Sequence, residues 1–238
     1  MARRFSIAKT MLITGASSGI GKEAAKVFAS DGWNVVATMR SPEKEQDLVP
    51  SDNLMLTRLD LQNAASIQEA VGQTLKKFGR IDLLVNNAGY GQYGLLEEVT
   101  PEKIWHQFET NVFGVIAVTQ AMLPLLRDAP AGRVVNISSA GGSLTLNSDP
   151  KNPHRSMFGT YSSSKTAINA ITLAFASALE STGIKVNAAC PGFTATDLNN
   201  FQGTRTVQQA AREPVRLALL DANGPTGTFS NEAGPLPW

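Results

Sequence analysis

The chain has 238 residues, and its charges nearly cancel, since 21 Lys and Arg residues stand against 20 Asp and Glu residues for a formal net charge of +1. Hydrophobic residues make up 42% of the sequence, an ordinary share for a globular domain. This balance argues against a dedicated nucleic-acid binder, and the single cysteine excludes a disulfide framework and a cysteine-rich zinc site. The two histidines, His106 and His154, lie far apart in the sequence, so no metal site is expected.

The sequence shows neither a membrane-span pattern nor a secretory-signal pattern. The longest apolar run, residues 114–126, is interrupted by polar residues and by Pro124, and it falls short of the roughly 18 apolar residues of a membrane span. Residues 1–10 include Arg3 and Arg4 but no apolar core after them, unlike a signal peptide. We therefore expect a cytoplasmic protein without membrane partners.

Short runs rich in valine, isoleucine and leucine alternate with longer amphipathic stretches along the chain. Most of the short runs are apolar throughout, as expected for strands that are buried on both faces of a sheet. The predicted strands lie at residues 11–14, 34–38, 54–59, 81–86, 133–138 and 185–190, with a short seventh strand at 227–230. The predicted helices lie at residues 19–30, 65–78, 101–126 and 161–181.

This alternation predicts an α/β protein with a single-domain, Rossmann-type, doubly wound parallel sheet of about seven strands and helices on both faces. No internal repeat or linker divides the chain, so residues 1–238 are expected to form one domain. Two polar segments interrupt the pattern. Residues 141–159 are expected to form an inserted loop, and residues 197–214 a lid segment with a short mobile helix.

A glycine-rich turn, Thr14-Gly-Ala-Ser-Ser-Gly-Ile-Gly21, follows the first predicted strand and opens the first predicted helix. Glycines let the backbone turn tightly and approach a pyrophosphate, and the helix N-terminus offers free N–H groups and a positive dipole end. The spacing G-x-x-x-G-x-G differs from the usual dinucleotide fingerprint, but the strand, turn and helix context is the one that dinucleotide binding requires. A turn that only starts a helix is the plain alternative.

The same turn also fits the G-x-S-x-G elbow of serine hydrolases, with Ser17 as the nucleophile. Such an elbow normally follows several strands and precedes an acid and then a histidine. This one follows the first strand, and His106 and His154 are the histidines downstream. A serine hydrolase that uses Ser17 is therefore the weaker alternative.

The second predicted strand ends in Thr38-Met39-Arg40, without the acid that usually holds the ribose hydroxyls of adenosine. Arg40 offers a planar fork of donors that suits a 2′-phosphate. The sequence therefore favours NADP(H) over NAD(H), with a solvated loop charge as the alternative role for Arg40.

Tyr161 and Lys165 are four residues apart, so on a helix their side chains share one face. A tyrosine with a pKa near ~10 exchanges protons poorly at neutral pH, and a nearby ammonium lowers that pKa. The pair is therefore expected to act as a general acid or base. A Tyr-x-x-x-Lys pair is common by itself, so it supports a catalytic role only together with the other motifs.

Taken in chain order, the motifs resemble those of the short-chain dehydrogenase/reductase family over nearly the whole chain. The matching pieces are Thr14 to Gly21, Asp60, Asn86-Asn87-Ala88-Gly89, Asn111, Asn136-Ile-Ser138-Ser139, Tyr161 with Lys165, and Pro191-Gly192-x-Thr194-x-Thr196. The resemblance implies an NADP-dependent oxidoreductase, similar to carbonyl reductases. Such an enzyme would transfer a hydride from NADPH to a ketone or aldehyde, or catalyse the reverse alcohol oxidation.

The resemblance also implies catalytic roles for single residues. Tyr161 would give a proton to the carbonyl oxygen, Lys165 would bind the nicotinamide ribose and lower the tyrosine pKa, and Ser139 would hold the substrate oxygen. Asn111 would hold a water molecule that links Lys165 to solvent, unless it is an ordinary kink residue. Ser138 ranks below Ser139 because neighbouring strand residues point to opposite faces.

The implied cofactor site extends over several segments of the chain. Its residues are Gly15, Ser17, Ser18, Gly19, Ile20, Gly21, Arg40, Asp60, Leu61, Asn87, Ala88, Gly89, Tyr161, Lys165, Pro191, Gly192, Thr194 and Thr196. Asp60 would accept a hydrogen bond from the adenine amino group, and Thr194 and Thr196 would meet the carboxamide. For Asn87, a role in stabilising its own loop is equally open.

The expected substrate pocket is mostly apolar, which favours a hydrophobic carbonyl compound. Its lining residues are Ser139, Tyr90, Tyr93, Phe193 and Leu198. The interval of 22 residues from Ser139 to Tyr161 is longer than in most relatives. The insertion leaves both a monomer and a homo-oligomer open. A non-catalytic NADP(H)-sensing protein is the second alternative, although the complete set of catalytic residues argues against it.

Overall fold

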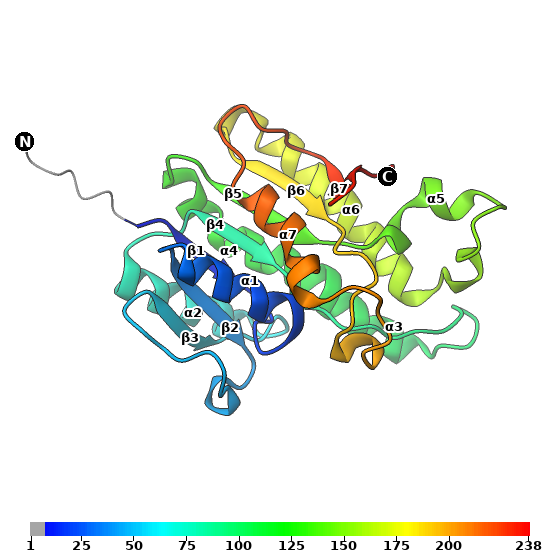
Figure 1. The fold of residues 1–238 in the computed structure, drawn as a ribbon, viewed down its shortest axis with the longest axis horizontal. Helices are drawn as coiled ribbons and strands as arrows, with labels where there is room; N and C mark the ends of the chain where they lie inside the picture. Colours follow the sequence, from blue (N-terminus) through cyan, green and yellow to red (C-terminus); the bar gives the residue numbers. More distant parts are fainter. Residues whose placement is uncertain (1–7) are drawn as a thin grey trace, which may run out of the picture.

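The computed structural model describes residues 8–238, so most of the N-terminal stretch that was compared with a signal peptide lies outside the described residues. Eight strands form one sheet at the centre of the molecule (Figure 1). Their bounds are β1 Thr10–Ile13, β2 Asn34–Met39, β3 Leu54–Arg58, β4 Leu83–Asn86, β5 Arg133–Ile137, β6 Lys185–Ala189, β7 Phe229–Asn231 and β8 Gly234–Pro235. The strand order is β3-β2-β1-β4-β5-β6-β7-β8.

The first seven strands pair in parallel, and β8 pairs antiparallel with β7. The order reverses between β1 and β4, which is the topological switch point of a doubly wound sheet. The predicted fold class is therefore confirmed. The eighth strand was not predicted, because a pair of Gly and Pro residues carries no periodic signal.

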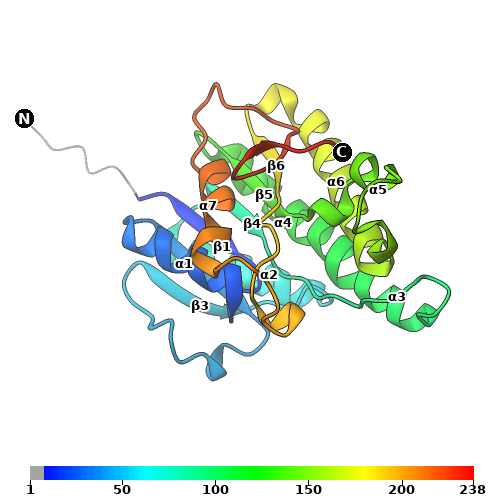
Figure 2. The same cartoon turned by 45° about the vertical axis from the view of Figure 1, so that its right-hand side comes forward.

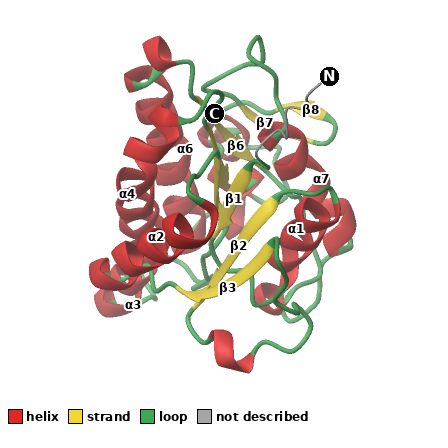
Figure 3. Cartoon of the chain, turned by 90° about the vertical axis from the view of Figure 1, so that its left-hand side faces the viewer, coloured by secondary structure: helices red, strands yellow, loops and turns green. Residues whose placement is uncertain are grey.

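Seven α-helices accompany the sheet in the described part of the chain. Their bounds are α1 Gly19–Ser30, α2 Ala64–Phe78, α3 Pro101–Phe108, α4 Gly114–Asp128, α5 Leu144–Ser148, α6 Thr160–Ala178 and α7 Val207–Ala218. Helices α1 and α7 cover one face of the sheet, and α2, α4 and α6 cover the other (Figure 3).

Each face of the sheet carries its own hydrophobic core, which explains why most strand positions are apolar. In β1, Met11 and Ile13 belong to the core under α1 and α7, whereas Leu12 belongs to the core under α2, α4 and α6. Successive strand residues point to opposite faces, so a strand that is covered on both sides needs apolar residues at every position.

The predicted helix at 101–126 is one helical run with a π-helical turn, Glu109–Phe113, between α3 and α4. By length and composition alone, Pro101–Asp128 could cross a membrane, and 44% of its apolar window is buried inside the protein. Helix α4 packs on α2 and β4, and α3 packs on α6. Val118, Met122 and Leu126 of this run thus belong to the hydrophobic core, whereas Trp105 and Phe113 are exposed.

Two segments differ from the expectation. The stretch 141–159 is not a plain loop, because it contains α5, whose first turn is capped by Ser143 Oγ accepting a hydrogen bond from the Leu146 N–H over 3.0 Å. The end of the described chain lies beside α5 in two views (Figure 1 and Figure 2), where the Thr145 N–H donates to the Trp238 carbonyl over 2.9 Å.

The second difference concerns the segment 197–214. Its last eight residues belong to α7, which buries Ala210 and Ala211 and packs against α1. These residues are therefore part of the helical layer that covers the sheet. Residues 192–206, which are named the lid segment, precede α7 and contain a 3₁₀ turn at Asp197–Asn199.

Candidate active site

The predicted site residues converge because they follow the carboxyl ends of parallel strands. Within two residues of the ends of β1 to β6 lie, in chain order, Thr14, Arg40, Asp60, Asn87, Ser139 and Pro191. The carboxyl ends of parallel strands share one edge of a sheet, and ligands of such folds bind at that edge near the switch point. Residues that are up to 177 positions apart in the sequence are thereby brought to one edge of the molecule.

The glycine-rich turn has no room for side chains at two positions. A Cβ on Gly15, which has a φ of +68°, would lie 2.7 Å from Ala88 Cα, and a Cβ on Gly21 would lie 2.3 Å from Asn87 Nδ2. Among residues 8–238, the N–H groups of Ser17 and Gly19 take part in no hydrogen bond within the protein. The start of α1 therefore presents free donors, as a pyrophosphate site requires.

Asn87 and Thr14 fasten this turn to the end of β4. Thr14 Oγ1 accepts the N–H groups of Asn87 and Ala88, each over 3.0 Å. The Asn87 side chain donates to the carbonyls of Thr14 and Gly15, each over 2.9 Å. The Asn87 side chain thus stabilises the glycine-rich turn. Thr14 belongs to the predicted motif. Its role as an acceptor of two hydrogen bonds was not predicted, because that role depends on a residue 73 positions away.

A cavity of about 400 Å³ lies between the glycine-rich turn and the loop after β2. Its lining residues are Ser17, Lys22, Met39, Arg40, Ser41, Lys44, Glu45, Gln46 and Asp47. Arg40 is exposed at this cavity. The next strand contributes Asp60, whose Oδ1 accepts the N–H of Gln62 over 3.1 Å.

Tyr161 and Lys165 occupy the first two turns of α6 and share one face, as their spacing predicts. The Lys165 side chain is 5% exposed, its Nζ lies 5.6 Å from the centroid of the Tyr161 ring, and it donates to the Ile137 carbonyl at the end of β5 over 2.8 Å. Burial lowers the pKa of Lys165 to about 8. The ammonium form is therefore held at the sheet edge at neutral pH.

The expected lowering of the Tyr161 pKa is wrong for this structure. Burial, with smaller effects of Tyr93 and Cys190, raises the pKa of Tyr161 well above its usual value. The ammonium of Lys165 lies over the ring and bonds to Ile137, so it does not offset the desolvation of the phenolate. Tyr161 is consequently a neutral phenol, the form that donates a proton.

The two adjacent serines after β5 have different surroundings. Ser138 is 2% exposed and donates to Asn169 Oδ1 over 2.6 Å in the core. Ser139 is partly exposed, and its Oγ accepts the Gly141 N–H over 3.1 Å. The backbone alternation thus directs Ser138 inward and leaves Ser139 at the sheet edge.

Asn111 lies in the π-helical turn and joins three segments. Its side chain accepts the Tyr90 N–H over 3.0 Å and donates to the Tyr90 carbonyl over 2.9 Å and to Ser164 Oγ over 3.1 Å. A Cβ on Gly89 would lie 3.0 Å from Asn111 Oδ1 and 3.9 Å from Lys165 Nζ, so the two side chains border the same space. Ser164, which was not predicted, completes this network.

The expected substrate residues divide into two groups. The Tyr93 ring lies against Tyr161, with a centroid distance of 5.3 Å, and Phe193 and Leu198 are exposed on the lid segment. The Tyr90 ring instead packs on His106 of α3, with a centroid distance of 5.2 Å.

The lid segment also contacts the glycine-rich turn. A Cβ on Gly19 would lie 3.3 Å from Thr196 Cγ2, and Thr194 of the same segment is 5% exposed. The predicted cofactor residues at both ends of the site are therefore neighbours in space.

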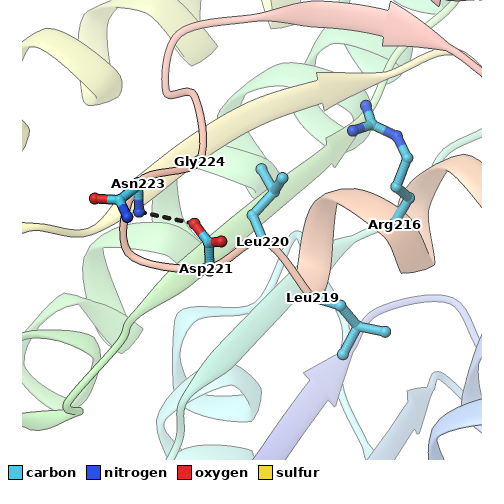
Figure 4. A pocket seen from close by; sticks show the side chains of 6 residues that line it. All are labelled: Arg216, Leu219, Leu220, Asp221, Asn223 and Gly224. Carbon is cyan, nitrogen blue, oxygen red and sulfur yellow. Dashed lines mark hydrogen bonds between the residues drawn. The ribbon is translucent and has the colours of Figure 1, made fainter.

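A second cavity, of about 620 Å³, lies at the C-terminal end of α7 (Figure 4). It is lined by Arg216, Leu219, Leu220, Asp221, Asn223 and Gly224. Arg133, the first residue of β5, donates to the carbonyls of Leu220 and Asp221. This cavity thus lies at the amino end of β5, at the edge opposite to Tyr161, and none of the predicted site residues lines it.

A family model of the short chain dehydrogenases matches residues 9–207. Because this match spans most of its length, the chain belongs to the short-chain dehydrogenase family. A 3-ketodihydrosphingosine reductase of Bacteroides thetaiotaomicron is 38% identical over 185 residues, which are 76% of this chain and 62% of that protein. Two further curated relatives are covered over 66% of their length, so the chain spans about two thirds of these relatives.

Two solved structures resemble the chain over nearly its whole length. The NADPH-bound carbonyl reductase from chicken fatty liver has a TM-score of 0.84 and 28% identity, and the match covers 97% of this chain and 94% of that one. The NADH complex of a 3-ketoacyl-(acyl-carrier-protein) reductase from Brucella melitensis has a TM-score of 0.83 and 28% identity, with 95% and 98% coverage. Nicotinamide dinucleotides of both kinds thus occur among its structural neighbours.

Proposed function

We propose that the chain is an NADPH-dependent carbonyl reductase that acts on hydrophobic ketones or aldehydes. The observation that carries this proposal is the arrangement of Tyr161, Lys165 and Ser139 at the carboxyl edge of the sheet, beside the glycine-rich turn. When bound, the dinucleotide supplies the hydride. The free N–H groups of Ser17 and Gly19 and the glycines at positions 15 and 21 would hold its pyrophosphate.

The catalytic residues would act on the substrate oxygen. Tyr161, as a neutral phenol, gives its Oη proton to the oxygen while the carbonyl carbon is reduced. Ser139 Oγ donates a hydrogen bond to the same oxygen and stabilises its developing charge. Lys165 Nζ, which is charged below a pH of about 8, places a cation beside the phenol and binds the ribose hydroxyls. Asn111 borders Lys165 and would hold the water molecule that returns the proton.

The preference for NADPH rests on Arg40 and its cavity. Arg40 directly follows β2, a strand that contains no carboxylate residue, and it lines the cavity together with Ser17 and Ser41. A guanidinium and two hydroxyls are suitable donors for a 2′-phosphate. The NADPH-bound carbonyl reductase among the structural neighbours supports the same choice.

The substrate class follows from the exposed side chains around the site. Exposed large hydrophobic residues gather on three segments, namely Tyr93, Leu95 and Leu96, then Leu144 and Met157, then Phe193, Leu198 and Phe201. The first segment reaches α6, since the Thr160 N–H donates to the Gly94 carbonyl over 3.4 Å. Exposed apolar groups around a site are best explained by an apolar ligand. The 3-ketodihydrosphingosine reductase among the relatives supports a ketone as the substrate.

The serine hydrolase alternative has no support in the geometry. His106 bonds to Gln62, and His154 lies in the insertion between β5 and α6, so neither histidine bonds to Ser17. A triad needs its base within hydrogen-bond reach of the nucleophile.

The proposal is tested by the fall of NADPH absorbance with a panel of ketones, aldehydes and quinones of increasing apolar surface. We expect turnover that rises with apolar surface and is lost in Tyr161→Phe, while NADPH binding, followed by fluorescence titration, is retained. NADPH binding without turnover of any compound would instead indicate the nucleotide-sensing alternative.

A further inference from the structure

The cavity beside Arg40 contains an ion-pair cluster that the proposed cofactor site does not account for. Lys22, in the first turn of α1, reaches two carboxylates of the loop after the 3₁₀ turn Pro42–Lys44. Its Nζ lies 2.9 Å from Glu45 Oε1 and 2.8 Å from Asp47 Oδ2. These three residues line the same cavity as Arg40 and Lys44.

The two carboxylates have different roles in the loop. The Glu45 side chain is 3% exposed, and its Oε1 also accepts the N–H groups of Asp47 and Leu48 over 2.8 and 3.0 Å. Glu45 therefore holds the loop in its conformation. The Asp47 side chain is 67% exposed, and within residues 8–238 its carboxylate bonds to Lys22 alone. Asp47 therefore affects the cavity through its negative charge.

All three groups are ionised at neutral pH. Burial by itself would lower the pKa of Lys22, but the hydrogen bonds to Asp47 and Glu45 outweigh burial and raise it. The hydrogen bond from Lys22 likewise holds the pKa of Asp47 below its usual range. The cavity thus contains three cations, Lys22, Arg40 and Lys44, and two carboxylates. Without Lys22 the charges would cancel, and an entering phosphate dianion would find no net attraction.

We propose that Lys22 determines cofactor specificity by offsetting one of the two negative charges of Glu45 and Asp47, so that a 2′-phosphate meets a net positive charge beside Arg40 and Lys44. This inference rests on the proposed NADPH dependence. Lys22 acts through the two carboxylates and is therefore a positioning residue. Its effect is confined to the 2′-phosphate, because a dinucleotide without that group places no added charge in the cavity.

Titration calorimetry of the full chain with 2′,5′-ADP and 5′-AMP tests the proposal, since these ligands differ only in the 2′-phosphate. Asp47→Asn removes an exposed carboxylate and is expected to tighten the binding of 2′,5′-ADP about threefold or more, with 5′-AMP unchanged. Lys22→Met is expected to weaken 2′,5′-ADP binding about tenfold, and Lys22→Arg, which keeps the charge, to retain it. The differences should shrink as salt is added.

Thermal unfolding of each variant separates charge from structure. Asp47→Asn keeps the Lys22–Glu45 pair, so it tests the proposal even where Lys22→Met does not fold. If Lys22 only held the loop in place, Lys22→Met would weaken the binding of both ligands alike, and Asp47→Asn would not tighten the binding of 2′,5′-ADP. Either result would overturn the inference. If the wild type binds 2′,5′-ADP more tightly than 5′-AMP and the variants keep the same ratio of affinities, only the role proposed for Lys22 is wrong. If the wild type does not discriminate, the NADPH preference is wrong, and this inference with it.

Discussion

Asn87 closes the space above Gly21, so that the end of β4 and the start of α1 are in direct contact. A Cβ on Gly21 would lie 2.3 Å from Asn87 Nδ2 and 2.5 Å from the Gly15 carbonyl oxygen. The Asn87 side chain cannot move aside freely, because it donates to the carbonyls of Thr14 and Gly15. The conformation of the glycine-rich turn thus depends on its contacts with Asn87 at the end of β4 as well as on its own glycines.

We therefore predict that Gly21→Ala lowers the free energy of unfolding by at least about 2 kcal/mol, because a methyl group must displace packed backbone. The matched control is Gly72→Ala in α2, where a Cβ meets nothing within 4 Å. That change should raise the stability by about 0.5–1 kcal/mol, since alanine is the better helix former. Urea denaturation of both variants checks the pair, and equal effects would contradict the packing argument.

The serine pair after β5 offers a second comparison. Ser138→Ala removes the buried donor to Asn169, so stability should fall by about 1–3 kcal/mol while kcat stays within a few-fold. Ser139→Ala should leave stability nearly unchanged and lower kcat about a hundredfold, because it removes a donor to the substrate oxygen. Steady-state kinetics and thermal unfolding are both measured. A larger loss of kcat in Ser138→Ala would reverse the assignment.

The burial of Lys165 predicts a pH-dependent stability. Its pKa falls from 10.5 to about 8 on folding, so the folded state binds fewer protons than the unfolded state between these values, and the wild type gains stability as the pH rises through that range. Lys165→Met lacks this gain. Wild-type stability relative to the variant should therefore increase by about 2 kcal/mol between pH 7 and pH 10. A constant difference in urea denaturation would show that the ammonium is not desolvated.

Arg40→Asp tests the cofactor preference directly. Replacing the guanidinium by a carboxylate removes charge-assisted hydrogen bonds to the 2′-phosphate and adds repulsion, so KM for NADPH should rise about 10- to 100-fold. KM for NADH should change little, because the ribose hydroxyls carry no charge. Arg58→Asp, at an exposed position at the end of β3, serves as the surface-charge control. Equal responses of the two cofactors would argue against a phosphate site at Arg40.

The sequence by itself determined the framework of this protein and the identity of its family. Strand and helix periods are local signals, and burial on both faces makes most positions of strands such as β1 apolar. Six of the eight strands were therefore predicted nearly to their ends. The Tyr161–Lys165 spacing fixed their shared face because one helical turn separates them.

Only the tertiary structure decided how the site residues act on one another. The raised pKa of Tyr161 depends on burial by segments such as the one that carries Tyr93, and Asn111 bonds to the backbone of Tyr90, 21 positions away. The contacts of Lys22 with Glu45 and Asp47 join residues that are 23 and 25 positions apart. Desolvation and ion pairing depend on which surfaces come into contact in the folded protein, and a local pattern in the sequence does not show those contacts.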